Sequence, residues 1–226
     1  MPERKRPLIL RPEENLDEAV RIFRSGGVIA FPTETFYGLG VDPFNVKAIE
    51  RLFALKGRPE KKPVSVIIKD TGMLKEAASE VPEAALPIIK RFWPGPLTIV
   101  FKARPSIPRI LTANTGRIGV RVSGSPDCQR LLDAIDSPIT ATSANPSGKK
   151  PPVTAAEVLA YFNGDLDVLI DGGELKGKTG STVIDITGAE IKVIREGEIP
   201  ASEITGCLSA KVRLKKSRYI NKEDCS

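Results

Sequence analysis

The chain has 226 residues, of which 41% are hydrophobic and 27% charged, so it can form a sizeable core and is not globally disordered. It contains no histidine and three widely spaced cysteines, Cys128, Cys207 and Cys225. A Ser-His-Asp or Cys-His nucleophile is excluded, as is a zinc site that uses imidazole. The net charge of +6 favours polyanionic partners such as nucleotides or RNA, although an ordinary basic surface explains it equally well.

No stretch of the sequence has the unbroken apolar length of a signal peptide or a membrane span. The odd, sparse cysteine count indicates a reducing compartment, so we predict a soluble cytoplasmic protein with no membrane partner. We predict one domain over residues 12–206, after an N-terminal extension at 1–11 and before a basic tail at 207–226.

Short β-branched runs alternate with longer stretches of helical periodicity, which is the pattern of a single α/β domain. Asn45 is a predicted N-cap and Gly57 a predicted helix terminator, and Thr154 with Glu157 forms a capping-box pattern. Residues 32–40 are predicted as a polar loop. The predicted helices span residues 15–25, 45–57, 83–93, 126–135 and 154–162. The predicted strands span residues 28–31, 64–68, 97–101, 117–122, 139–142, 168–170, 182–186 and 191–194.

Residues 172–179 match the phosphate-binding P-loop pattern and follow a strand-like segment. A P-loop requires a helix after its Lys-Thr pair, because the amides of that helix bind the phosphates. Here residues 180–186 are strongly strand-like, so we predict a loop between two strands.

Three other segments carry groups suited to a ligand. Residues 56–59 place two cations at a helix end, residues 143–148 form a Ser/Asn-rich turn, and residues 32–40 bring several hydroxyls to a strand's carboxyl end. Each alone is better explained by a solvated helix end, an ordinary polar turn or a self-capping turn. Their joint occurrence favours an anionic, phosphorylated ligand.

These segments, with others in the same order, resemble the motifs of YrdC-like domains, specifically threonylcarbamoyl-AMP synthases, and the resemblance covers residues 12–206. The matching segments are Phe31-Pro32-Thr33-Glu34-Thr35-Phe36-Tyr37-Gly38-Leu39-Gly40, Lys56-Gly57-Arg58-Pro59, Trp93-Pro94-Gly95-Pro96-Leu97-Thr98, Val120-Arg121-Val122, Ser143-Ala144-Asn145 and Ser181-Thr182-Val183-Ile184-Asp185.

The resemblance implies a nucleotidyltransferase on a twisted mixed sheet, flanked by helices and with a positively charged concave cavity. It would make L-threonylcarbamoyladenylate from L-threonine, bicarbonate and ATP, releasing pyrophosphate. The product would serve the threonylcarbamoyl modification of the tRNA adenosine next to the anticodon, with tRNA and tRNA-modification transferases as possible partners. ATP is then a substrate, and Mg²⁺ is expected on its triphosphate, with no protein ligand for the metal identified.

The resemblance also implies roles for individual residues. The predicted catalytic and phosphate-binding pair is Lys56 and Arg58, and replacing either with alanine is predicted to abolish synthesis with little unfolding. The other predicted nucleotide contacts are Ser143, Asn145 and Arg195. The predicted threonine contacts are Thr35, Arg121 and Ser181. Thr33 and Tyr37 belong to the same signature with less defined roles.

The sequence departs from the family pattern at three places. Ile67 stands where many longer relatives have a histidine, Gly116–Gly119 stand where relatives often have an Asp-Thr pair, and the basic tail resembles a short form without the second domain. Two alternatives stay open. One is an RNA-binding module without catalysis, and the other is carbamoyl transfer, although the zinc-binding and acylphosphatase segments expected around such a domain are lacking.

Overall fold

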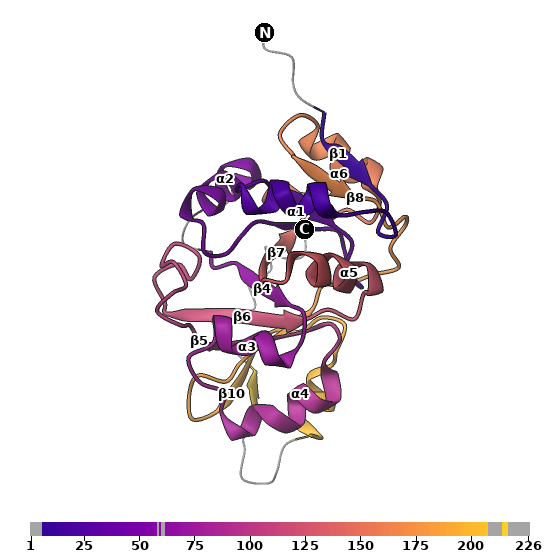
Figure 1. Cartoon of the computed structure of the whole chain (residues 1–226). Coiled ribbons are helices and arrows are strands. Elements are labelled where there is room, and N and C mark those ends of the chain that lie inside the picture. The colour runs from indigo at the N-terminus through magenta and orange to yellow at the C-terminus, as the bar shows by residue number, and fades with distance from the viewer. Residues whose placement is uncertain (1–5, 58, 60–61, 208–213, 217–226) are drawn as a thin grey trace.

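The computed structural model describes residues 6–57, 59, 62–207 and 214–216, and within them a mixed β-sheet of eleven strands runs through the molecule (Figure 1). Along the sheet the order is β1-β8-β2-β3-β7-β4-β6-β5-β9-β10-β11, and half of the neighbouring pairs are parallel. The strands are β1 (Leu8–Leu10), β2 (Ile29–Phe31), β3 (Gly38–Gly40), β4 (Ser65–Ile68), β5 (Leu97–Lys102), β6 (Arg117–Val122), β7 (Ile139–Ser143), β8 (Val168–Ile170), β9 (Thr182–Asp185), β10 (Ile191–Arg195) and β11 (Leu214–Lys216). The predicted mixed α/β fold is confirmed.

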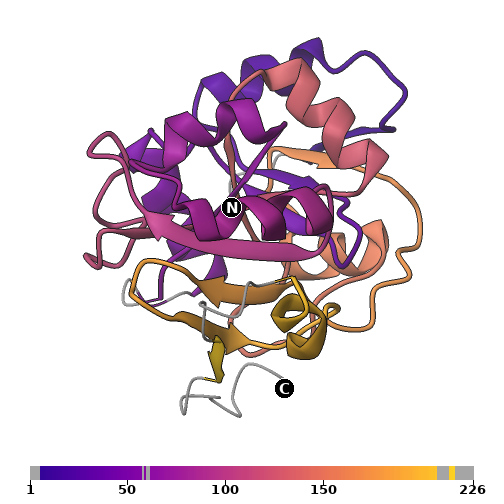
Figure 2. The ribbon, with the colours of Figure 1, turned by 90° about the horizontal axis from the view of Figure 1, so that it is seen from below.

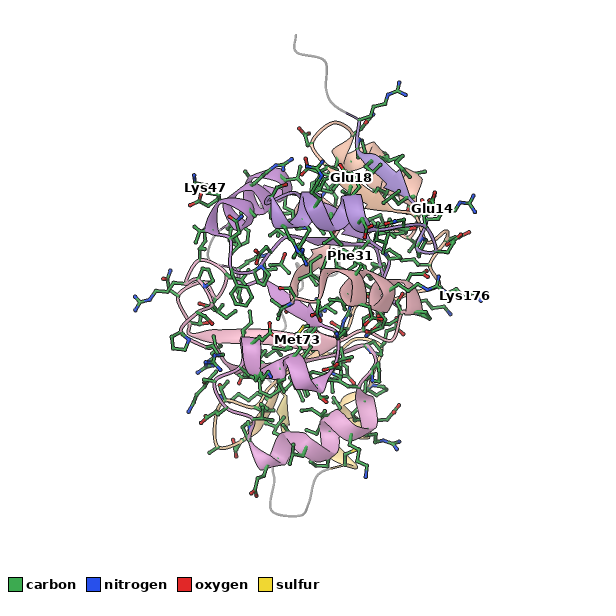
Figure 3. The ribbon with its side chains drawn as sticks, in the orientation of Figure 1. Glu14, Glu18, Phe31, Lys47, Met73 and Lys176 are labelled. Carbon is green, nitrogen blue, oxygen red and sulfur yellow. The ribbon has the colours of Figure 1, made fainter. Side chains whose placement is uncertain are left out.

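Helices cover both faces of this sheet. The helices are α1 (Asp17–Arg24), α2 (Val46–Lys56), α3 (Leu74–Ala77), α4 (Leu86–Phe92), α5 (Pro126–Ile135), α6 (Ala155–Phe162) and α7 (Ala201–Thr205), with short 3₁₀ turns η1 (Thr71–Met73) and η2 (Glu83–Ala85). The larger core contains buried residues of α2, α3, α4, α6 and α7. The smaller core forms under α1 and α5, which lie side by side (Figures 1 and 2), and it includes Phe31, labelled between those helices in Figure 3.

The helix boundaries follow from local hydrogen-bonding chemistry. Asn45 Oδ1 accepts a hydrogen bond from Ala48 N at 3.2 Å, and Gly57 ends α2 in the left-handed conformation at φ 59°. The Thr154 side chain and the N3 residue Glu157 form a complete capping box at the start of α6. These predicted caps are confirmed, and the proline in α4 is tolerated because it lies in the first turn.

The prediction of residues 32–40 as a loop throughout is wrong, because Gly38–Gly40 forms strand β3 between β2 and β7. Glycine usually indicates a turn, but here it permits close packing on the strand. A Cβ at Gly40 would lie 2.4 Å from Ile139 Cγ1, and one at Gly38 would lie 3.2 Å from the ring of Phe31.

Two strands lie outside the predicted domain limits of 12 and 206. β1 pairs in parallel with β8, and β11 pairs in parallel with β10, so both belong to the sheet. Among the described residues, no helix has the length and apolar character that crossing a bilayer requires.

The P-loop pattern at residues 172–179 forms no helix after its Lys-Thr pair. The chain continues into β9, and Lys178 is exposed, as is Lys176 at the periphery of the molecule in Figure 3. The prediction of a loop between two strands is confirmed.

Candidate functional site

Four small residues of the inner strands lie on one face of the sheet. Strand pairing places Ser65 opposite Ala141, on the same face as the α1/α5 core, and both residues are half-buried although their strands are internal. Gly119 lies beside them, since a Cβ there would be 2.5 Å from Ser65 Oγ and 3.0 Å from Thr98 Cγ2. We call Ser65, Ala141 and Gly119, together with Ser143 at the end of β7, the open face. Their small side chains leave this part of the sheet partly accessible.

The two predicted phosphate segments are joined at one end of the open face. Lys56 is the last residue of α2 and is buried, and its Nζ donates hydrogen bonds to Asn145 O at 2.6 Å and to Ser143 O. Ser147 N donates in return to Lys56 O at 2.8 Å. The ammonium group therefore fixes the turn after β7 against the helix end. Arg58 lies outside the described residues.

Asn145 presents an unsatisfied acceptor in this turn. Its Nδ2 donates to Pro146 O at 3.1 Å and to Lys149 O, which orients the amide. Its Oδ1 is buried and accepts no hydrogen bond among the described residues. Buried polar atoms are almost always paired, so this oxygen indicates a place for a ligand donor.

The threonine-rich segment before β3 forms a compact turn. Thr33 Oγ1 accepts from Thr35 N at 3.2 Å and from Phe36 N at 3.3 Å, and it donates to Phe36 O at 2.7 Å. The Thr35 hydroxyl lies 3.1 Å from Thr33 Oγ1. Thr33 therefore stabilises the turn, and Thr35 is the member of the pair with fewer backbone bonds.

Tyr37 holds a neighbouring loop. Its hydroxyl donates to Gly173 O at 2.7 Å and accepts from Gly172 N at 3.1 Å. Burial, together with the negative charge of Asp171, raises the pKa of the Tyr37 phenol far above its usual value. This loop, residues 172–180, passes so close to the threonine turn that a Cβ at Gly177 would lie 1.8 Å from Thr35 O.

A charged pair, in which Arg121 is buried and Glu34 is half-buried, lies beside the open face. Arg121 is 7% exposed, and its Nη1 lies 3.8 Å from Glu34 Oε1. Glu34 Oε2 accepts a hydrogen bond from Ser123 Oγ, whereas Oε1 is buried and has no hydrogen-bond partner among the described residues. Sequence reasoning did not single out Glu34, although it stands between the two threonines of the recognised motif.

The far end of the open face is held by β10. Ser181 Oγ lies 2.9 Å from Thr98 Oγ1, and Arg195 donates to Ser181 O through Nη2 at 2.8 Å and Nε at 3.2 Å. Arg195 thus fixes the backbone at Ser181.

The same region anchors the loop of residues 172–180. Glu198 accepts hydrogen bonds from Thr179 N at 2.8 Å and from Lys178 N at 3.2 Å. The hydrogen bond from Thr179 N is the main reason that the pKa of the Glu198 carboxyl is lowered.

The strand order relates several of the predicted residues to one another. Ser143, bonded to Lys56, ends β7, Arg121 lies in β6, and Ser181 directly precedes β9. The order of these strands in the sheet is β7, β4, β6, β5 and β9. Ile67, opposite Arg121 in β4, is fully buried in the α1/α5 core and offers no polar contact. Among the described residues, no three His, Cys, Asp or Glu side chains are grouped so that they could hold a metal ion.

Comparison with known proteins gives consistent matches. The Sua5/YciO/YrdC family, described as telomere recombination, matches residues 21–197. A threonylcarbamoyl-AMP synthase of Pyrococcus abyssi (strain GE5 / Orsay) is 38% identical over 202 residues, which are 87% of this chain and 59% of that protein. A protein of the same name from Halorhodospira halophila (strain DSM 244 / SL1) is 39% identical over 149 residues, 66% of this chain and 78% of that protein.

A solved structure extends the likeness to three dimensions. The crystal structure of P. abyssi Sua5 complexed with L-threonine has a TM-score of 0.86 and 36% identity, and it covers 93% of this chain and 62% of that chain. This chain spans less than two thirds of the length of the Pyrococcus relative. The family match covers most of the chain, and the Halorhodospira relative is 39% identical over most of its own length. The chain therefore belongs to the Sua5/YciO/YrdC family.

Proposed function

We propose that this protein synthesises L-threonylcarbamoyladenylate from L-threonine, bicarbonate and ATP, with release of pyrophosphate. The observation that carries the proposal is the open face, which has a buried guanidinium without a hydrogen bond among the described residues on one side and an unsatisfied amide acceptor, Asn145 Oδ1, on the other. Relatives named threonylcarbamoyl-AMP synthase, and a related structure complexed with L-threonine, support the same activity.

The amino acid would bind at the Arg121 side. A guanidinium matches a carboxylate with two parallel hydrogen bonds, and a buried one does so in surroundings where such bonds are strong. The hydroxyls of Ser181 and Thr35 would complete the contacts, since both residues are buried close to this side of the sheet.

The nucleotide would bind at the Lys56 side. The buried ammonium of Lys56 would supply positive potential beneath the phosphates, and Arg58 would add a second cation. Asn145 Oδ1 and Ser143 would contact the nucleoside. Arg195 would contact the nucleotide from the far end of the open face. Mg²⁺ would enter bound to the triphosphate, as part of the substrate.

The proposed chemistry fits a site without histidine. The threonine amine adds to bicarbonate, giving a carbamate and water, and a carbamate oxygen then attacks the α-phosphorus as the bond to pyrophosphate breaks. Neither step needs a protein nucleophile. Alignment of the two substrates and neutralisation of their charge supply the rate enhancement. The product would then serve tRNA modification, in which a transferase passes the threonylcarbamoyl group to the adenosine next to the anticodon.

The direct test is pyrophosphate release by the purified protein with L-threonine, bicarbonate, ATP and Mg²⁺, with each component omitted in turn. We expect release only in the complete mixture, and lower release when serine replaces threonine. A folded protein that releases no pyrophosphate would refute the proposal. Tight, salt-sensitive RNA binding without nucleotide binding would instead support the RNA-binding alternative.

A further inference from the structure

One carboxylate oxygen of Glu34 accepts a hydrogen bond within the protein, and the other does not. Ser123 Oγ donates to Oε2, whereas Oε1 has no hydrogen-bond partner among the described residues although it is buried. Leaving a buried acceptor unpaired is costly, and more so when it carries charge. Glu34 therefore needs a further donor that the fold itself does not provide.

Arg121 does not provide that donor. The separation of 3.8 Å between Arg121 Nη1 and Glu34 Oε1 exceeds hydrogen-bond length, although it is short enough for electrostatic attraction. The guanidinium in turn has no hydrogen bond among the described residues. The pair consists of opposite charges, held side by side, that both keep hydrogen-bonding capacity.

We propose that Glu34 binds the α-ammonium group of the amino-acid substrate while Arg121 binds its carboxylate. The inference rests on the proposed function and adds a residue to it. In any α-amino acid the nitrogen and the carboxyl carbon share one Cα, which puts them about 2.5 Å apart. A zwitterion of these dimensions matches a carboxylate and a guanidinium held 3.8 Å apart.

This assignment explains how the reacting amine is directed. The ammonium group first loses a proton to solvent, and the neutral amine then forms the new bond to carbon, so the position of the nitrogen sets the geometry of that step. Anchoring the carboxylate alone leaves the nitrogen free to rotate about the bond between Cα and the carboxyl carbon. A second contact at Glu34 Oε1 fixes that rotation, and it makes the site selective for α-amino acids over hydroxy acids of the same shape.

The experiment measures binding of three small molecules, by calorimetry or ligand-observed NMR, to the full chain. The probes are L-threonine, 2,3-dihydroxybutanoate, in which a hydroxyl replaces the amine, and threoninol, which lacks the carboxylate. The variants are Glu34→Gln and Arg121→Gln, with Glu50→Gln as the matched control because Glu50 is exposed on α2.

We expect Glu34→Gln to weaken L-threonine and threoninol about 10- to 100-fold, because the neutral amide removes the negative charge that strengthens the bond to the ammonium group. Its affinity for the hydroxy acid should stay within about twofold of the control. Arg121→Gln should show the opposite selectivity, weakening threonine and the hydroxy acid but not threoninol. Glu34→Asp should recover part of the threonine affinity.

The outcomes separate this inference from the proposed function. If the unmodified protein binds threonine and releases pyrophosphate, but Glu34→Gln weakens the hydroxy acid as much as threonine, Glu34 only positions Arg121 and the inference is wrong. Equal threonine affinity in Glu34→Gln and the control also overturns it. Unchanged ATP affinity in Glu34→Gln serves as the check that the variant is folded. Pyrophosphate release that fails in the unmodified protein counts against the proposed function instead.

Discussion

Replacing Lys56 with methionine removes the ammonium that joins α2 to the turn after β7, while keeping most of the apolar length of the side chain. In the structure Nζ donates to Asn145 O at 2.6 Å and to Ser143 O. The Ser143 carbonyl keeps a second donor, Asn145 N at 2.9 Å. The carbonyl of Asn145 is the acceptor that loses more.

The magnitude follows from these two bonds. Hydrogen bonds to charged groups contribute about 1.5 to 3 kcal/mol each, and one of the two acceptors is partly compensated, so we expect a loss of about 2 to 4 kcal/mol. Domains are stable by only about 5 to 15 kcal/mol, so this is a large fraction of the free energy of unfolding. In a chain of this size the melting temperature should fall by roughly 5 to 15 °C.

The assay is urea unfolding, together with hydrogen exchange of the Ser147 amide, which donates to Lys56 O. The matched control is Lys47→Met, because Lys47 is exposed on the same helix (Figure 3). Equal unfolding midpoints for the two variants, with ATP binding lost only in Lys56→Met, would refute the reasoning. Lys56 would then serve the ligand and not the fold, as the sequence pattern alone predicts.

Three further predictions concern the loop of residues 172–180 and the open face. Tyr37→Phe should cost about 1 to 2 kcal/mol in urea unfolding, because the hydroxyl that donates to Gly173 O is lost. Gly119→Ala should weaken threonine and ATP binding, and Ser65→Ala should partly restore it, since the new Cβ would lie 2.5 Å from Ser65 Oγ. The pKa of Glu198 is lowered below its ordinary 4.5. The stabilisation that its ionised carboxylate gives to the loop of residues 172–180 is therefore fully present above about pH 4.5 and is lost as the pH falls below that value. Hydrogen exchange of the loop, corrected for intrinsic rates, should rise as the pH falls below about 4.5 in the unmodified protein but not in Glu198→Gln.

The parts of the fold that depend on neighbouring residues could be predicted from the sequence. Asn45 caps α2 and Thr154 caps α6 because an N-cap bond spans only three residues. Strand β3 escaped prediction for the opposite reason. Its glycines are required by side chains packed from Phe31 and Ile139, and only the sheet order reveals those contacts.

The candidate site shows the same division. The motifs predict which segments carry ligand chemistry, and the structure places Ser143 on the open face and Arg121 next to it in β6. What the motifs could not predict is which polar atoms are already in use, because that depends on register between distant strands. Tyr37 is bonded to its loop, whereas Glu34, not singled out, has an unpaired oxygen beside Arg121.

The polar groups around the open face therefore fall into two physical classes. Thr33 and Arg195 bond to backbone atoms, and substitution there should be felt first in stability. Glu34 Oε1 and Asn145 Oδ1 have no hydrogen-bond partner among the described residues, so substitution there should be felt first in binding. A buried atom without a partner gains free energy only when a ligand arrives, because the cost of desolvating it has already been met on folding. The unpaired oxygens lie with Arg121 on one side and Lys56 on the other, and two substrates meeting between them would each satisfy one.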